Sequence, residues 1–304
     1  MQQLFSLFLS WIMMFLSLFG INLGGGTAQP AENAPFTPAY GLEQTIAYGS
    51  ADTQNLDLYL PSGKAQTGLI LFLHGGAWVT GSKESYSYDA RTWRNRGYAT
   101  ATMNYRFLGN GVLFSEELDD ITAALNAIVQ TAQYNGITLT KAVFVGISAG
   151  GHLALLYAYT KAAEAPVRPA AVISSSAPTD FTDPAFIRSS DMVQSVITNI
   201  GLDPNLVASA LESGLAEAFI PMLRNISPAK LVTSATVPTL MAHGMQDTIV
   251  PYSNAQRLDA ALTGAGVRHD FVSFPNAGHA LTGDPVNTAR FQTLFAQYIA
   301  AFLT

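Results

Sequence analysis

The chain contains no cysteine. Disulfide bonds, thiolate catalysis and cysteine-based metal sites are therefore excluded, although this absence does not decide the compartment. Charge is also scarce: 12% of the 304 residues are charged, and the formal net charge is -6. A nucleic-acid-binding domain would carry a basic face. The composition therefore argues against a nucleic-acid partner and against electrostatic docking on anionic lipid.

The N-terminal region is the one long apolar run. Residues 4–23 are almost wholly apolar and carry no charge; about 20 such residues can span a membrane, whereas a signal-peptide core needs about 7–15. Gly26 and Ala28 suit the positions three before and one before a signal-peptidase cut. We therefore expect residues 1–28 to be a signal peptide of an exported (periplasmic or secreted) protein. The alternatives are an uncleaved anchor, attaching the protein to a membrane through residues 4–23, and a buried core helix.

Residues 29–41 contain three prolines and few large apolar residues, which predicts an extended linker. The rest, 42–304, is expected to form one domain of class α/β. Strands are expected over 43–48, 56–60, 69–73, 98–105, 142–145, 170–174, 237–242 and 268–274, and helices over 88–96, 116–132, 151–159, 254–263 and 287–303. This alternation predicts a mostly parallel central sheet with helices on both faces. Residues 177–231 break the alternation and are expected to form a small helical cap insertion, with a helix over 206–218.

A G-x-S-x-G motif, Gly146 to Gly150, stands between the apolar run 142–145 and a helical segment. In this strand–turn–helix context the serine is expected on a sharp, strained turn, with its hydroxyl exposed above the sheet edge. Glycines two positions before and after the serine are expected because side chains there would collide with the neighbouring strand and helix. The motif therefore favours Ser148 as a nucleophile, against the alternative of an ordinary strand–helix turn.

A serine nucleophile needs a base and an acid that orients the base. In hydrolases that carry a serine on this turn, the order along the chain is serine, acid, histidine, so only His269 and His279 come late enough. His269 lies inside an expected strand, whereas His279 lies in the loop before the last helix, and we expect His279 to be the base. Asp247, on the loop that follows strand 237–242, is the expected acid, with a turn-capping role as the alternative. His243 is expected to brace that loop.

The oxyanion formed on attack needs backbone N–H donors. Ala149, directly after the serine, is one expected donor, and the loop 74–77 (HGGA) after an early strand is expected to supply the others. Its glycines allow close approach to the substrate oxygen; a glycine turn without function is the alternative. Trp78 and Tyr105 either line the acyl or alcohol pocket or belong to the aromatic core, and the sequence leaves both roles open.

Six motifs together resemble the α/β-hydrolase superfamily. They are HGGAW at 74–78, NYR at 104–106, GISAGGH at 146–152, SP at 227–228, HG-x-x-D at 243–247 and GH at 278–279. The chain is most similar to the hormone-sensitive-lipase-like esterases and to the related BD-FAE-type and kynurenine-formamidase-like branch, over about residues 44–303. The resemblance implies an α/β-hydrolase fold, a triad of Ser148, Asp247 and His279, and Gly76, Ala77 and Ala149 as oxyanion donors. Ala77 stands where the lipase-like esterases usually carry a third glycine, which moves the match toward the second branch.

The expected function is that of a serine carboxylesterase acting on short- to medium-chain esters through an acyl-enzyme. The substrate is expected to be a small-molecule or polysaccharide-linked ester, and neither a metal nor an organic cofactor is implied. Two alternatives remain: cleavage of an arylformamide by the same site, and a non-catalytic binding module on this fold. The sequence does not indicate the oligomeric state.

Overall fold

The computed structural model describes residues 41–304, except 190–193, 195, 199–201 and 214–219. The expected signal peptide or anchor, residues 1–28, and the expected linker up to residue 40 lie outside the described residues. Among the described helices, none is both long and apolar enough to cross a bilayer.

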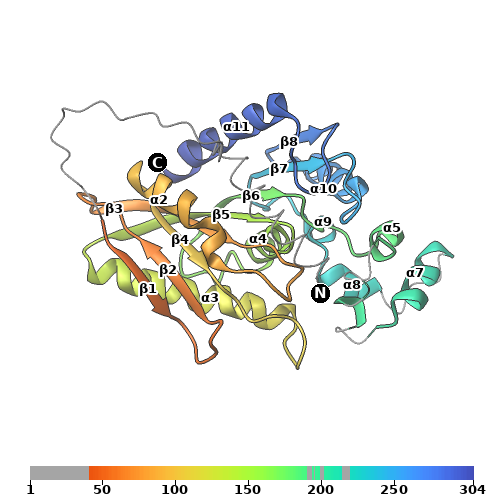
Figure 1. Ribbon diagram of the computed structural model, residues 1–304, viewed down its shortest axis with the longest axis horizontal. Helices are drawn as coiled ribbons and strands as arrows, with labels where there is room; N and C mark the ends of the chain where they lie inside the picture. Colours follow the sequence, from red (N-terminus) through yellow and green to blue (C-terminus); the bar gives the residue numbers. More distant parts are fainter. Residues whose placement is uncertain (1–40, 190–193, 195, 199–201, 214–219) are drawn as a thin grey trace, which may run out of the picture.

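Eight strands form one sheet, in the order β1-β2-β4-β3-β5-β6-β7-β8 (Figure 1). The strands are β1 (Glu43–Ala47), β2 (Asn55–Tyr59), β3 (Gln66–Leu73), β4 (Ala99–Met103), β5 (Thr138–Ile147), β6 (Pro169–Ser175), β7 (Thr239–Gly244) and β8 (His269–Phe274). β1 and β2 run antiparallel to their neighbours, and the pairings from β4 to β8 are parallel. The mostly parallel sheet predicted from the alternation of strands and helices is confirmed.

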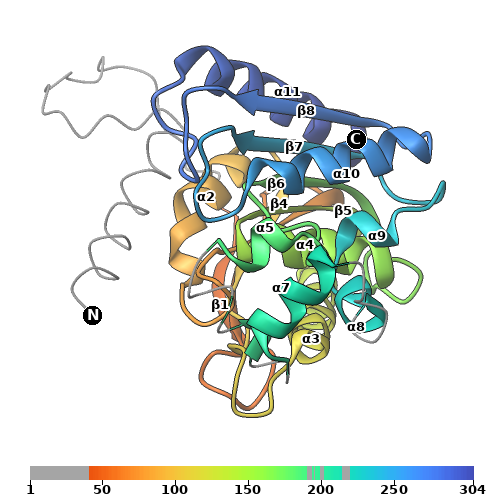
Figure 2. The ribbon, with the colours of Figure 1, turned by 90° about the vertical axis from the view of Figure 1, so that its right-hand side faces the viewer.

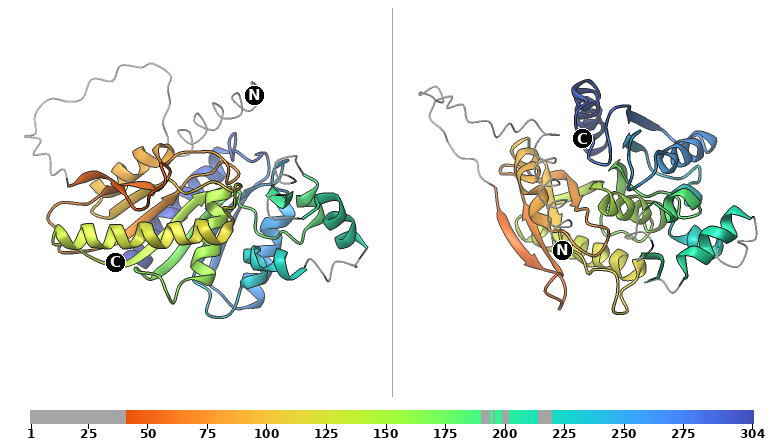
Figure 3. Two further views of the ribbon diagram at one scale, coloured as in Figure 1. Left: turned by 90° about the horizontal axis from the view of Figure 1, so that it is seen from below. Right: turned by 45° about the vertical axis from the view of Figure 1, so that its right-hand side comes forward.

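Helices cover both faces of the sheet (Figures 1 and 3). The long helices are α2 (Ser87–Asn95), α3 (Phe114–Tyr134), α4 (Ala149–Thr160), α10 (Tyr252–Gly264) and α11 (Pro285–Leu303), and a 3-10 turn, η1 (Lys83–Tyr86), precedes α2. Successive residues of β3 alternate between two hydrophobic cores: Leu69 and Leu71 pack with α3, α4 and α10, whereas Ile70 and Phe72 pack with α2 and α11. This double burial explains why the central strands are continuous apolar runs.

The described part of residues 177–231 includes four short helices, α5 (Pro184–Ile187), α7 (Pro204–Glu212), α8 (Ile220–Asn225) and α9 (Pro228–Leu231). α9 packs against α4 and α10, and α5 packs against α7. Together these helices lie beyond the ends of the parallel strands (Figures 1 and 2). The helix expected over 206–218 is α7, which begins two residues earlier and ends at Glu212; part of the expected range falls outside the described residues. A cap role for this segment stays a prediction.

Candidate active site

Ser148 occupies the one residue between β5 and α4. Its backbone is left-handed, with φ 53° and ψ -123°, a conformation that costs a non-glycine residue about 1–3 kcal/mol. Two backbone hydrogen bonds hold it there: the Ser148 N–H donates to the Ser175 carbonyl (2.8 Å), and the Ser148 carbonyl accepts from the His152 N–H (2.9 Å). The strained turn expected from the motif is present.

The two outer glycines of the motif are required by packing. A Cβ at Gly146 would lie 2.3 Å from the carbonyl carbon of Gly150, and a Cβ at Gly150 would lie 2.1 Å from the carbonyl oxygen of Leu73. Both distances are far inside van der Waals contact. The first turn of α4 therefore sits directly on the end of β3, where the HGGA loop begins.

Loops from three strands bring Ser148, His279 and Asp247 into one hydrogen-bonded chain. The Oγ of Ser148 lies 3.0 Å from Nε2 of His279, and Nδ1 of His279 lies 2.7 Å from Oδ2 of Asp247. Because a carboxylate can only accept, Nδ1 carries the proton and Nε2 accepts from the serine hydroxyl. All three residues are less than 10% exposed. Nε2 is therefore placed to take the hydroxyl proton.

The Asp247 carboxylate is held by four donors. Oδ1 accepts from the N–H groups of Ile249 and Val250, each at 2.9 Å, and Oδ2 accepts from His279 and from Nε2 of His243 at 3.3 Å. Burial raises the pKa of Asp247, but the hydrogen bonds from His243 and His279 outweigh it and hold the pKa well below its ordinary value. The charged form is thus favoured despite burial.

His243 braces the loop that carries Asp247, as the sequence predicts. Its Nε2 lies 2.9 Å from the carbonyl oxygen of Val250 as well as near Asp247. His269, the other late histidine, lies at the start of β8 and pairs with Asp259 on α10 at 3.1 Å. It is not brought to Ser148.

The predicted oxyanion donors lie on two neighbouring segments. The loop after β3 has positive φ at three successive residues, Gly76 (122°), Ala77 (51°) and Trp78 (61°). Ala149 is the first residue of α4, so its N–H has no carbonyl partner within the helix. A helix N-terminus also favours negative charge. The contact of Gly150 with the end of β3 brings these segments together.

Trp78 and Tyr105 are both buried, at 2% and 0% exposure. The Tyr105 hydroxyl donates to the His74 carbonyl (2.7 Å), and its ring stacks on the His74 ring with centroids 4.4 Å apart. The Trp78 indole packs edge-on against Phe114 and His152. The sequence left two roles open for these residues. The contacts support a place in the aromatic core, because each ring already packs against neighbouring rings.

His74, which stacks on Tyr105, belongs to the same buried cluster. Its Nδ1 donates to the Gly75 carbonyl at 2.7 Å, and burial lowers the pKa of its imidazole to about 4. The first residue of the HGGA loop is therefore a neutral histidine.

One residue that contacts His279, the expected base, was not predicted from the sequence. The Ser176 hydroxyl donates to the carbonyl oxygen of His279 at 2.8 Å, and Ser176 has a left-handed backbone with φ 48°. It follows the end of β6, one residue beyond Ser175, which binds the Ser148 N–H. Serine is common at strand ends, so no local pattern distinguishes this residue.

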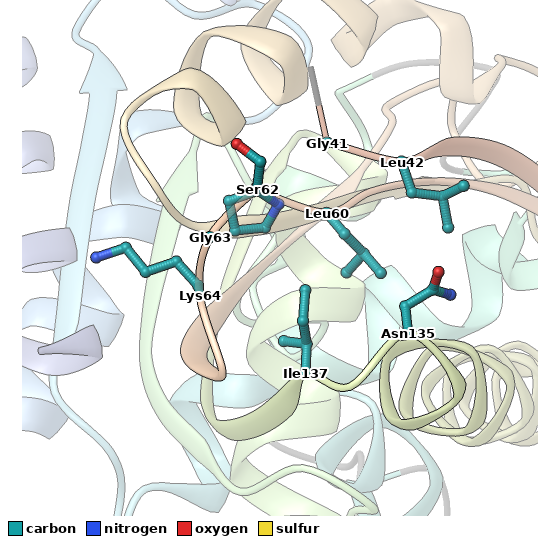
Figure 4. A pocket seen from close by; sticks show the side chains of 9 residues that line it. Gly41, Leu42, Leu60, Ser62, Gly63, Lys64, Asn135 and Ile137 are labelled. Atoms are coloured by element: carbon teal, nitrogen blue, oxygen red, sulfur yellow. The ribbon is translucent and has the colours of Figure 1, made fainter. Parts of the chain in front are cut away.

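The described residues contain no group of three or more histidine, aspartate or glutamate side chains that could hold a metal ion. A shallow pocket lies elsewhere, lined by residues 41–42 and 60–64 with Asn135 and Ile137 (Figure 4). Ile137 precedes β5, whereas Ser148 follows its other end, and a strand of ten residues spans about 30 Å. The pocket is therefore separate from the serine.

Comparison with known proteins gives a family and a fold. The BD-FAE family model matches residues 56–262, well over half of the chain. Among curated proteins, the chain is similar to the isoprenylcysteine alpha-carbonyl methylesterase ICME of Arabidopsis thaliana (25% identity, covering 88% of this chain and 64% of that protein) and to esterase LipC of Mycobacterium tuberculosis (26%, 79% and 60%). It is also 24% identical to the polyketide synthase ausA of Emericella nidulans, over 75% of this chain but 12% of the synthase. The chain thus spans less than two thirds of these relatives.

Among solved structures, esterase B of Lactobacillus rhamnosis superposes with a TM-score of 0.68 at 18% identity, covering 99% of this chain and 93% of that one. Esterase Est2 of Thermogutta terrifontis superposes with a TM-score of 0.64 at 22% identity, covering 87% and 92%. At these identities the likeness establishes a shared fold.

Proposed function

The chain belongs to the BD-FAE family of α/β-hydrolase-fold esterases, and from this membership we propose that it is a serine carboxylesterase acting on short- to medium-chain esters. The observation that carries the proposal is the chain of two hydrogen bonds from Ser148 through His279 to Asp247. The low exposure of all three residues strengthens these bonds, because a low local dielectric increases electrostatic interactions.

In the proposed reaction, Ser148 attacks the ester carbonyl while His279 Nε2 takes its proton. Asp247 keeps the proton on Nδ1 and stabilises the imidazolium. The negative charge on the carbonyl oxygen is accepted by the N–H groups of Gly76, Ala77 and Ala149; one such donor typically contributes about 10²–10³ in rate. His279 then protonates the leaving alcohol, and water attacks the acyl-enzyme by the same path.

The proposed substrate is a small-molecule or polysaccharide-linked ester. Relatives of this chain carry the names esterase and methylesterase, and one superposed structure is described as a carbohydrate esterase from gut microbiota (TM-score 0.64, 20% identity, covering 88% of this chain and all of the other). Such names support an ester substrate without selecting the alcohol. We also propose export through residues 1–28, which mass spectrometry of the mature N-terminus would test.

The deciding experiment compares wild type with Ser148→Ala on p-nitrophenyl esters from acetate to palmitate. We expect the variant to lose about 10⁶ in kcat, because triad members act as a unit, and to lose labelling by a fluorophosphonate probe. We expect the wild type to favour the shorter acyl chains. Retention of most activity in folded Ser148→Ala would refute the proposal. N-formylkynurenine in the same panel tests the amide alternative, and a folded wild type without turnover or labelling would indicate a binding module.

A further inference from the structure

The loop that follows β3 needs a support beyond its own backbone. Ala77 and Trp78 both have left-handed φ values, 51° and 61°, and a left-handed conformation costs a residue with a side chain about 1–2 kcal/mol. Such residues keep this conformation only where the surroundings enforce it. The Trp78 carbonyl accepts from the Leu108 N–H (2.8 Å), which accounts for one constraint. The Trp78 side chain supplies another.

The Trp78 indole N–H donates to Nδ1 of His152 at 3.1 Å. Because an indole N–H can only donate, Nδ1 must be unprotonated. The proton then lies on Nε2, which is 2.8 Å from the carbonyl oxygen of Ile226, an acceptor. Both nitrogens of the buried ring are thus satisfied in the neutral form, and burial lowers the pKa of His152 to about 4, which keeps that form at neutral pH.

His152 joins three parts of the site. Its backbone N–H donates to the carbonyl of Ser148, so it closes the first turn after the nucleophile. Its ring packs against Phe114 and Phe181, with centroids 5.1 Å and 5.4 Å away. Through Ile226 it reaches the chain between α8 and α9, at the end of the predicted cap. The nucleophile turn is therefore bonded to the His152 backbone, and the loop after β3 and the cap end are bonded to its fully buried side chain.

We propose that His152 is a positioning residue for the oxyanion site. It holds the Trp78 indole and thereby the left-handed backbone at Ala77, so that the N–H groups of Gly76 and Ala77 stay aimed at the developing oxyanion. It acts through Trp78 and does not touch the substrate. This inference rests on the proposed function, because an oxyanion forms only if Ser148 attacks a carbonyl.

Two substitutions test the link from its two ends. Trp78→Phe keeps an aromatic ring but removes the donor, and His152→Leu removes both nitrogens. We expect each to lower kcat on p-nitrophenyl acetate about 10-fold, less than the roughly 10²–10³ that follows loss of a whole donor, with KM within about twofold of wild type. Affinity for a trifluoromethyl ketone, whose adduct carries the oxyanion, should fall by the same factor. The double variant should lose little more than either single variant, because both remove one link.

Conservative and control variants separate positioning from stability. His152→Gln retains one acceptor and one donor and should recover part of the kcat that His152→Leu loses. Tyr159→Phe is a matched control on the same helix, because it removes a hydrogen bond to the Thr239 hydroxyl (2.7 Å) far from the loop. It should lower Tm and leave kcat unchanged. If His152→Leu fails to fold, kcat and inhibitor affinity of Trp78→Phe and His152→Gln test the proposal instead.

The inference is overturned if folded Trp78→Phe and His152→Gln keep the wild-type kcat and inhibitor affinity, whatever their Tm, because His152 would then serve packing alone. That result leaves the proposed function standing as long as Ser148→Ala is inactive. Activity retained by Ser148→Ala would instead refute the proposed function itself.

Discussion

Glu117 should make the protein less stable as pH rises. The side chain lies in the first turn of α3, is fully buried, and neither carboxyl oxygen has a hydrogen-bond partner within the described part of the chain. Burial raises its pKa well above 4.5; Asp120 raises it further, and Arg106 lowers it. The folded protein therefore keeps a proton on Glu117 where the unfolded chain has released it. Above pH 4.5, and up to the pKa in the folded state, the free energy of unfolding falls by about 1.4 kcal/mol per pH unit from this group.

Glu117→Gln removes this cost, because an amide cannot ionise. Urea unfolding followed by tryptophan fluorescence at pH 5, 6 and 7 gives the difference in unfolding free energy between variant and wild type. We expect the difference to grow in favour of the variant by about 1.4 kcal/mol for each pH unit over which the folded protein keeps this proton. A difference that stays flat over this range would refute the reasoning, because Glu117 would then be ionised in the folded state.

The neighbouring Glu116 is a matched control with the opposite sign. Burial raises its pKa, but hydrogen bonds from the Leu113 N–H (2.9 Å) and the Ser115 hydroxyl together outweigh burial, and the pKa is lowered. Its carboxylate therefore contributes stability above pH 4.5, which is lost as pH falls through the lowered pKa. Glu116→Gln should be less stable than wild type, by an amount that does not grow between pH 5 and pH 7.

Three further predictions each concern a single residue. Asp247→Asn should lower kcat about 10⁴-fold in ester hydrolysis, because an amide disfavours the required tautomer of His279; a loss below tenfold would contradict its role. Gly150→Ala should reduce soluble yield and Tm, because its Cβ would lie 2.1 Å from the Leu73 carbonyl oxygen; wild-type behaviour would contradict this packing. Burial raises the pKa of Asp89 to about 8, so Asp89→Asn should raise Tm at pH 7 and lose that advantage at pH 4, and a gain independent of pH would contradict a neutral Asp89.

Most of the secondary structure could be predicted because the pattern of apolar residues along the chain follows burial. The run 69–73 predicts the buried part of β3, which is 0% exposed, although the strand begins earlier at Gln66. β5 is likewise longer than the expected 142–145 and begins at Thr138, which pairs with Gln66 in the register of the two strands. Their first residues are polar and exposed, so an apolar run marks only the covered part of each strand.

The residues proposed for catalysis could be selected because each follows the end of a strand in a recognisable motif. Ser148 and His279 are 131 positions apart, however, and their approach to 3.0 Å depends on how the sheet is ordered from β5 to β8. The bond from Ser176 to the His279 carbonyl depends on the same order. The roles of Trp78 and Tyr105 stayed open for a related reason: an aromatic residue beside a motif suits a pocket and a core equally well.

The amino-acid sequence alone determined the alternation of strands and helices, the glycines around the serine turn, and the order of serine, acid and histidine along the chain. These features depend on neighbours a few residues away, whose spacing and size are visible in the sequence. Only the tertiary structure decided that a buried histidine joins Trp78 to Ile226 and that no hydrogen-bond partner for Glu117 lies among the residues the structure describes. Such pairings depend on which surfaces of distant elements meet, and a hydrogen-bond partner far along the chain leaves no local periodicity.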